Sequence, residues 1–243
     1  MFLFLPLSAP SRASGKEAKL TVAAAADLAF ALKDMAAGFE KEAGVKTVIS
    51  FGSTGMLAKQ IENNAPFDLF FAADARTIET LRDNGYVEAD TITRYADGAL
   101  ALVVNKKSGV KVSGIKDLLR PEMKWIAIAQ PLHAPYGRAA MEALKNAGVW
   151  EKIKYRIVYG ESVRQALAYV QNGDATAGII ALSVADVPEV EYIAVDPSLH
   201  SPIRQSAAVI TASKEKTSAR EFLNYVTGKK GREILKKYRF ILP

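Results

Sequence analysis

The chain of 243 residues contains no cysteine and only two histidines. Without cysteine it forms no disulfide bond, no thiolate metal site and no lipid anchor of the cysteine type. His133 and His200 are isolated from each other and lack the spacing of metal ligands, so both are expected in ordinary loops. We therefore expect no direct metal ligand, no cofactor and a protein that is not tethered through a lipidated cysteine.

Long apolar runs are also absent, since none reaches the roughly 20 residues that a membrane-spanning helix needs. The chain begins with a short apolar segment, residues 1–10 (MFLFLPLSAP), followed by the small residues of 11–15 (SRASG). This start resembles the apolar part and cleavage region of a secretory signal peptide, although the basic beginning is missing. We expect residues 1–18 to be a remnant of a signal peptide or a disordered arm, and the mature protein to be exported to a periplasm.

A concentrated patch of basic residues is missing too. The net charge is +6, but lysine and arginine are scattered and are not interleaved with aromatic residues in a stripe. Binding to nucleic acid is therefore not expected. A weak positive field could still speed the arrival of an anion.

What the sequence does contain is a regular alternation of expected strands and helices. Residues 20–25 form a short apolar run, and 28–42 carry apolar residues at helical spacing, with Asp27 at the expected N-cap and Gly44 at the end. Further strands are expected at 45–51, 68–73, 99–104, 125–129, 157–158, 175–180 and 203–211, and further helices at 53–63, 76–84, 137–146, 162–171 and 219–226. This order predicts an α/β fold with mostly parallel sheets flanked by helices.

Four strand-to-helix junctions carry small or hydroxyl residues, at 25–28, 51–55, 133–137 and 160–164. The start of a helix has unpaired N–H groups and a partial positive charge, and ligands of open α/β sheets lie beyond the carboxyl ends of the strands. The four junctions could therefore surround a small anion. Ordinary turn and cap chemistry explains the same residues, and 52–55 (GSTG) lacks the lysine of a phosphate-binding P-loop.

At these junctions the chain resembles the molybdate-binding component of bacterial ABC transporters. The similar segments are 22–28 (VAAAADL), 50–61 (SFGSTGMLAKQI), 65–74 (APFDLFFAAD), 134–137 (APYG) and 161–167 (ESVRQAL). In combination these motifs are specific to the family, whereas each alone is weak. The resemblance runs from about residue 19 to residue 243.

The resemblance implies a two-lobed periplasmic-binding-protein fold of type II, with the ligand in a cleft between the lobes. Residues 19–98 and 206–243 would form lobe 1, and 99–205 would form lobe 2. Such a protein captures molybdate, with tungstate as a second candidate, delivers it to a membrane permease and catalyses no reaction. We expect it to act as a monomer.

The resemblance also implies which residues contact the anion: Ala26, Asp27, Ser53, Thr54, Tyr136 and Val163. Thr54 stands at the key hydroxyl position of the family, whereas Tyr136 and Val163 would donate through backbone N–H groups. Asp27 would also donate through its N–H, because a carboxylate aimed at a dianion would repel it. We expect its side chain to cap the following helix.

Two positions depart from many members of the family. Ala26 replaces a serine or threonine, and Ala181 replaces a tyrosine that follows the strand of 175–180; a subgroup shares this alanine together with the tyrosine of the APYG loop. Sulfate or phosphate therefore remains an alternative ligand, although neutral donors favour a fully ionised dianion over phosphate.

Two other classes of function are also considered. An enzyme would need an acid–base or metal constellation, and none is visible, because Asp68 and Asp74 are expected to cap strand ends. A regulatory module would need a DNA-binding helix-turn-helix segment, and none is visible either. Arg138 is expected on a solvated helix face.

Overall fold

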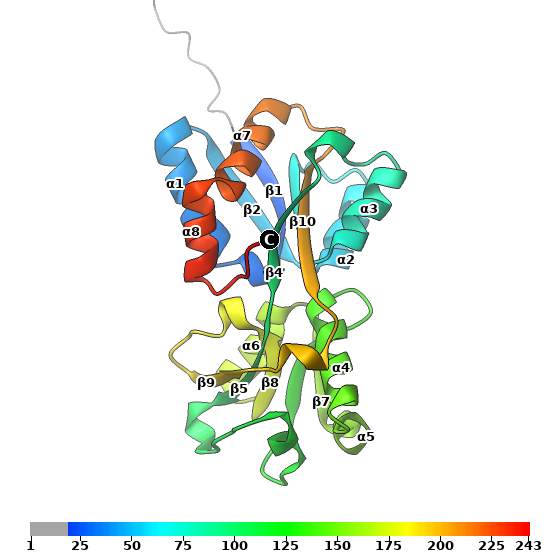
Figure 1. Ribbon diagram of the computed structural model, residues 1–243, viewed down its shortest axis with the longest axis vertical. Helices are drawn as coiled ribbons and strands as arrows, with labels where there is room; N and C mark the ends of the chain where they lie inside the picture. The colour runs from blue at the N-terminus through cyan, green and yellow to red at the C-terminus, as the bar shows by residue number, and fades with distance from the viewer. Residues whose placement is uncertain (1–18) are drawn as a thin grey trace, which may run out of the picture.

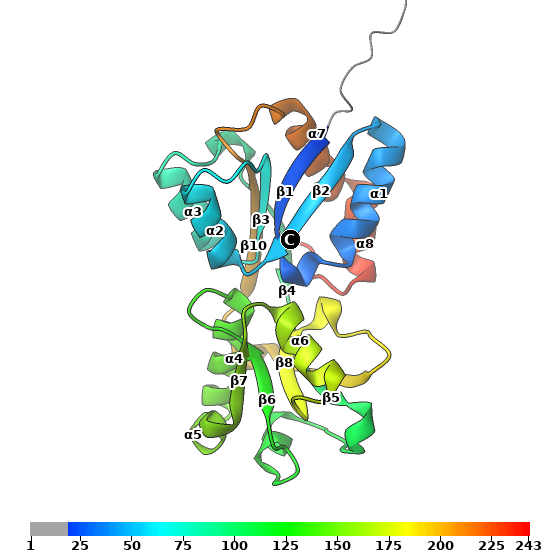
Figure 2. The ribbon, with the colours of Figure 1, turned by 180° about the vertical axis from the view of Figure 1, so that it is seen from behind.

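The computed structural model describes residues 19–243, so the expectations for residues 1–18 lie outside the described residues. The chain forms two α/β lobes, one above the other, each built on a five-stranded sheet (Figures 1 and 2). This confirms the two-lobed α/β architecture. Within the described residues, no helix is both long and apolar enough to cross a membrane.

Lobe 1 has the strand order β2-β1-β3-β10-β4. Its strands are β1 (Lys19–Ala25), β2 (Lys46–Gly52), β3 (Leu69–Ala72), β4 (Thr93–Gly98) and β10 (Ile203–Val209). Its helices are α1 (Ala31–Ala43), α2 (Thr54–Glu62), α3 (Ala75–Asp83), α7 (Lys216–Thr227) and α8 (Lys229–Lys237). Helices α1, α7 and α8 cover one face of the sheet, and α2 and α3 cover the other. Both faces are therefore buried, as the apolar strand sequences require.

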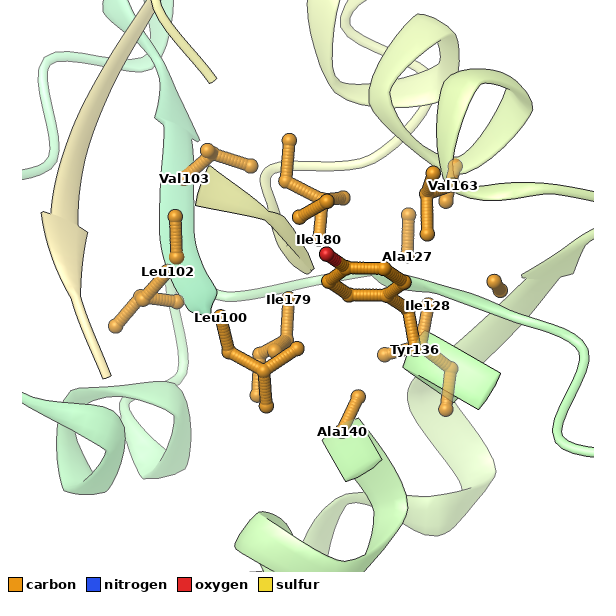
Figure 3. Close-up of a cluster of buried hydrophobic side chains, with 14 of the residues drawn as sticks. Leu100, Leu102, Val103, Ala127, Ile128, Tyr136, Ala140, Val163, Ile179 and Ile180 are labelled. Atoms are coloured by element: carbon orange, nitrogen blue, oxygen red, sulfur yellow. The ribbon is translucent and has the colours of Figure 1, made fainter. Parts of the chain in front are cut away.

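Lobe 2 has the strand order β7-β6-β8-β5-β9. Its strands are β5 (Leu100–Asn105), β6 (Ile126–Ala129), β7 (Ile157–Gly160), β8 (Ala177–Ala181) and β9 (Val190–Ala194), and its helices are α4 (Pro135–Asn146), α5 (Trp150–Ile153) and α6 (Val163–Asn172). Figure 3 shows aliphatic side chains of β5, β6 and β8 around the ring of Tyr136. The start of α4 is thereby held against the core of this lobe.

Short 3₁₀ helices complete the chain. They are η1 (Ala26–Leu28), η2 (Ala89–Thr91), η3 (Lys106–Ser108), η4 (Ile115–Leu119), η5 (Lys154–Arg156), η6 (Leu182–Val184) and η7 (Pro197–Leu199). The helix expected from residue 28 begins at Ala31 instead, because η1 occupies the first turn. Its end is as expected, with Gly44 in the left-handed conformation at φ 69°.

Each sheet is mixed rather than mostly parallel. In lobe 1, β1 is parallel to β2 and β3, whereas β10 is antiparallel to β3 and β4. In lobe 2, β6 is parallel to β7 and β8, whereas β5 is antiparallel to β8 and β9. Strands β5 and β10 are the ones that enter from the opposite lobe, which explains their reversed direction. The sequence interpretation missed β4, β9, α5 and α8.

The two connections between the lobes lie side by side. Only Ala99 separates β4 from β5, and β10 returns antiparallel to β4, with Ile203 opposite Gly98. Figure 1 shows these two segments passing together from one lobe to the other. Because just two adjacent strands join the lobes, small backbone rotations there could change the angle between them.

Candidate oxyanion site

The four strand-to-helix junctions meet at one small pocket between the lobes. Its cavity of about 10 Å³ is lined from lobe 1 by residues 25–27, 52–54 and 73, and from lobe 2 by residues 134–136 and 163. The structure therefore brings together all the residues that the sequence interpretation selected: Ala26, Asp27, Ser53, Thr54, Tyr136 and Val163. Among the lining residues there is no lysine or arginine.

A larger hollow of about 910 Å³ lies at the opposite end of the lobe 1 sheet. Its only lining carboxylate, Asp68, accepts the N–H of Thr21 and the hydroxyl of Ser213, both at 2.7 Å. Asp68 is thus a structural group at the strand end, as expected from the sequence. No helix start of the four junctions faces this hollow, so the small pocket is the better candidate for an anion.

The Thr54 hydroxyl is held in place by a hydrogen bond that leaves its proton free to donate. It is the first residue of α2, and its side chain accepts the N–H of Ala73 at 2.9 Å. A hydroxyl has one proton to donate, and this hydrogen bond leaves that proton unused. Thr54 is only 1% exposed, so its donor is directed within the protein rather than toward bulk water.

Ser53 has a partner that the sequence interpretation assigned to an ordinary loop. Its Oγ lies 2.8 Å from Nδ1 of His133, and Nε2 of the same ring lies 3.2 Å from a carboxylate oxygen of Glu161. If the neutral ring donates from Nε2 to Glu161, Nδ1 must accept the proton of Ser53. A doubly protonated ring would donate to Ser53 and free its hydroxyl proton. His133 belongs to the third strand-to-helix junction, and this position in the sequence could have indicated that it lies near the pocket.

Lobe 2 contributes backbone groups. Tyr136 is the second residue of α4, after Pro135, and Val163 is the first residue of α6. The first N–H groups of a helix have no acceptor within the helix, and the helix dipole gives this end a partial positive charge. The side chains of lobe 2 that line the pocket are apolar apart from the Tyr136 hydroxyl.

The side chain of Asp27 does not cap a helix, so that expectation was wrong. The N-cap of α1 is Phe30, and Asp27 lies within η1 with only 1% of its surface exposed. Its Oδ2 accepts the hydroxyl of Tyr136 at 3.0 Å and the amide of Gln205 at 2.8 Å. The carboxylate therefore faces lobe 2 and the returning strand β10 rather than its own helix.

This network extends to both connections between the lobes. The Tyr95 hydroxyl on β4 donates to Oε1 of Gln205 on β10 at 2.6 Å, and the Ser183 hydroxyl of η6 donates to the carbonyl of Asp27 at 2.8 Å. The sequence interpretation missed Tyr95, Gln205 and Ser183. Tyr95 and Gln205 stand among other polar residues such as Arg94 and Arg204, so their position in the sequence gives no local signal for a site.

Burial raises the pKa of Asp27 from 3.8 to about 6, although the hydrogen bonds from Gln205 and Tyr136 lower it. Burial and the nearby Asp27 charge raise the pKa values of Tyr95 and Tyr136 well above 10, so both hydroxyls remain protonated donors. Oδ1 of Asp27 is buried and has no hydrogen-bond partner among residues 19–243.

Close approaches of the two lobes surround the pocket. The N–H of Gly55 donates to the carbonyl of His133 at 2.8 Å, and a Cβ on this glycine would lie 2.9 Å from the same oxygen. A Cβ on Gly98 would overlap the Tyr136 hydroxyl. Glycine is therefore required at both positions for the lobes to meet in this arrangement.

Asp74 and Arg138 form an ion pair between the lobes at the rim. Asp74 was expected to cap a strand end, but it caps the helix α3 instead, by accepting the N–H of Thr77 at 2.7 Å. The Arg138 side chain is 47% exposed and does not line the pocket, which agrees with its expected place on a solvated helix face.

Two α/β lobes joined by two adjacent strands, with a small polar pocket between them, define the architecture of a solute-binding protein. The chain belongs to the bacterial extracellular solute-binding protein family, whose model matches residues 20–241. The type II periplasmic-binding-protein fold expected from the sequence is confirmed by the solved structures it resembles.

Three relatives illustrate the family. The molybdate-binding protein ModA of Azotobacter vinelandii is 36% identical over 231 residues, covering 93% of this chain and 91% of the relative. A putative ABC transporter substrate-binding lipoprotein, YvgL of Bacillus subtilis, is 33% identical, and the match covers 93% of this chain and 88% of the relative. The solved structure of the Azotobacter vinelandii periplasmic molybdate-binding protein superposes with a TM-score of 0.86 at 32% identity, covering 92% of this chain and 99% of that one.

Proposed function

We propose that this protein captures molybdate in the pocket between its lobes, without catalysing a reaction. The observation that carries the proposal is the convergence of three helix starts and the Thr54 hydroxyl on one buried pocket. Relatives that match more than nine-tenths of the chain are named as molybdate-binding proteins, which supports this choice of anion. Under this proposal Ala26, Asp27, Ser53, Thr54, Tyr136 and Val163 surround the oxygen atoms of the anion, and no side chain ligates the metal atom.

The donors of the pocket suit a fully ionised dianion. No lysine or arginine lines the pocket of the described chain, so its positive potential comes from the starts of α2, α4 and α6. Neutral N–H and O–H groups can each donate to an oxygen of a tetrahedral anion that carries no proton of its own. Tungstate has the same shape and charge and is the second candidate, with sulfate and phosphate as the alternatives to test against it.

Capture would proceed by closure of one lobe on the other, with 19–98 and 206–243 moving against 99–205. Support comes from the cross-lobe hydrogen bonds of Gly55 with His133 and of Asp27 with Tyr136, which an opened cleft would break. The anion adds contacts to both half-sites, and these contacts stabilise the closed state over the open one. Small-angle scattering should therefore show a smaller radius of gyration with molybdate than without it.

The binding test is a thermal-shift and calorimetric panel of molybdate, tungstate, sulfate, phosphate and an organic anion. A ligand that binds only the folded protein stabilises it by about 2.7 kcal/mol at 100 times its Kd. We expect a clear rise in melting temperature with molybdate and a much smaller one with sulfate at equal concentration. No shift with molybdate or tungstate across a wide concentration range would refute the proposal.

The same proposal assigns the protein to the periplasm, as an exported monomer that delivers its anion to the membrane permease of an ABC transporter. The relatives named as periplasmic or as ABC transporter components support this assignment. Fractionation of the native host should recover the protein outside the inner membrane, and sedimentation should give the mass of one chain. A permanent dimer in sedimentation would contradict the monomer.

A further inference from the structure

Asp27 is an unusual neighbour for an anion. Asp27 lines the pocket together with Ser53 and Thr54, yet no lysine, arginine or histidine among residues 19–243 forms an ion pair with its carboxyl group. A carboxylate and a dianion in one buried pocket repel each other strongly, because little water screens them. Either the anion avoids this site, or Asp27 is not charged when the anion is bound.

The two oxygen atoms of Asp27 differ in a way that favours the second possibility. Oδ2 accepts two hydrogen bonds, from Tyr136 and from Gln205, whereas the buried Oδ1 has none within the described chain. The backbone N–H groups of Asp27 and Leu28 act weakly on the carboxyl group and lower its pKa, but neither forms a hydrogen bond to Oδ1. A proton would therefore bind to Oδ1 rather than to Oδ2. Protonation removes the negative charge and turns Oδ1 from an unpaired acceptor into an O–H donor.

Resting on the molybdate-binding function proposed above, we propose that Asp27 takes up one proton when the lobes close on the dianion, and that its protonated Oδ1 donates a hydrogen bond to an anion oxygen. The proton comes from solvent, and no covalent bond to the anion forms or breaks. The donor stands beside Ala26, which provides no hydroxyl of its own. Asp27 is thus a specificity-determining residue, because it makes affinity for a dianion depend on pH.

The environment of Asp27 is consistent with this role. Burial outweighs the hydrogen bonds that lower the pKa of its carboxyl group and raises it to about 6, and a nearby dianion must raise it further. Affinity should therefore increase as the pH falls through the pKa of the complex, and it should level off below the pKa of the free protein. Between these two values, affinity changes by up to about tenfold for each pH unit.

The other polar groups near Asp27 do not change their protonation state and so cannot account for the proton uptake. Tyr136 on α4 and Tyr95 on β4 remain protonated because burial raises their pKa values, and Gln205 on β10 is neutral. On α6, which packs against η1, the Arg164 guanidinium lies 4.7 Å from the centre of the Phe30 ring and remains charged.

Three further titratable groups, Asp74, His133 and Glu161, lie near the pocket and could also make binding depend on pH. Asp74, whose charge acts on Tyr95, is paired with Arg138. His133, with Glu161 beside it, contacts Ser53 and is the rival source of a pH effect. Protonation of His133 would also favour an anion, so the experiment must distinguish this ring from the Asp27 carboxyl group.

The experiment is titration calorimetry of the full chain with molybdate at about pH 6, 7 and 8, in buffers of different ionisation enthalpy. The variants are Asp27→Asn, which keeps the acceptor for Tyr136 and Gln205 and places an amide donor at Oδ1, and the matched control His133→Asn. Wild type should take up close to one proton per molybdate within this range and bind at least about fivefold more tightly at pH 6 than at pH 8. Asp27→Asn should take up no proton and bind at pH 8 at least as tightly as wild type does at pH 6, whereas His133→Asn should keep the proton uptake and the pH dependence of wild type, whatever its affinity.

Wild-type binding that is independent of pH and takes up no proton would overturn the inference, while leaving molybdate binding itself intact. So would a pH effect that persists in Asp27→Asn and is lost in His133→Asn. Failure to bind molybdate at any pH would instead refute the proposed function. If Asp27→Asn does not fold, infrared difference spectra of wild type labelled with ¹³C-aspartate decide the matter: a labelled carboxylic acid band must appear when molybdate is added.

Discussion

The two halves of the pocket are built from different chemical groups. Lobe 1 offers the start of α2 together with the side chains of Thr54, Ser53 and Asp27, whereas lobe 2 offers mainly the backbone N–H groups at the starts of α4 and α6. Side-chain donors can be removed by substitution, but backbone donors survive any substitution that preserves the helix start. We therefore expect lobe 1 to control which anion is preferred, and lobe 2 to supply mainly a general attraction for negative charge.

The comparison is tested most strongly by Thr54→Ala in lobe 1 against Val163→Ala in lobe 2. Hydrogen bonds to charged groups contribute about 1.5–3 kcal/mol, so Thr54→Ala should weaken molybdate binding about tenfold or more. Val163→Ala keeps its backbone N–H and should change the Kd by less than about twofold. Calorimetry of both variants in one buffer measures the difference.

Thr54→Ser serves as the control for this pair, because serine retains the hydroxyl that accepts from Ala73. It should bind within about threefold of wild type. Equal effects of Thr54→Ala and Val163→Ala would show that the two halves of the pocket do not differ in the way described.

Gly55→Ala tests the contact at which the halves meet. The added Cβ would lie 2.9 Å from the carbonyl oxygen of His133, so the lobes could close only with a local shift. Overpacking of this kind costs at least about 1 kcal/mol, which predicts binding at least about fivefold weaker and a smaller compaction in scattering. Gly114→Ala is the matched control, because its Cβ would meet no atom within 4 Å. Unchanged binding by Gly55→Ala would mean that the ligand-bound lobes do not close this far.

Ala26→Ser adds a side-chain hydrogen-bond donor to the lobe 1 half of the pocket. Ala26 lines the pocket and is 4% exposed, so the new hydroxyl would lie beside the anion. One hydrogen bond to a charged group contributes at most about 3 kcal/mol, and we expect molybdate binding to tighten severalfold. Titration of both proteins at one pH gives the result. Weaker binding would show that the pocket is packed around alanine and has no room for another oxygen.

The smallest effect is expected at the rim, where Arg138 pairs with Asp74 across the lobes. Exposed ion pairs contribute about 0–1 kcal/mol, so Arg138→Ala should change the molybdate Kd by less than about fivefold. The effect should also shrink as ionic strength rises, because salt screens exposed charges. A loss comparable with that of Thr54→Ala would place Arg138 among the groups that contact the anion.

Much of the fold and the position of the pocket could be predicted from the sequence. Helical periodicity and terminal glycines such as Gly44 predicted the helices that flank the sheets, and the hydroxyl residues at 53 and 54 marked one helix start. Strands β4 and β9 were missed, because short segments with mixed polarity give no clear period. The mixed direction of the sheets also escaped prediction, since it depends on which strand crosses from the other lobe.

The local elements, the helix starts and the residues that carry the family resemblance could all be recognised in the amino-acid sequence. The surroundings of Asp27 could not, because its partners Tyr136 and Gln205 are 109 and 178 positions away along the chain. Capping and periodicity act within a few residues and are therefore visible in a sequence. A buried polar network joins single residues from distant segments, and its members become recognisable only when the two crossing strands bring both lobes together.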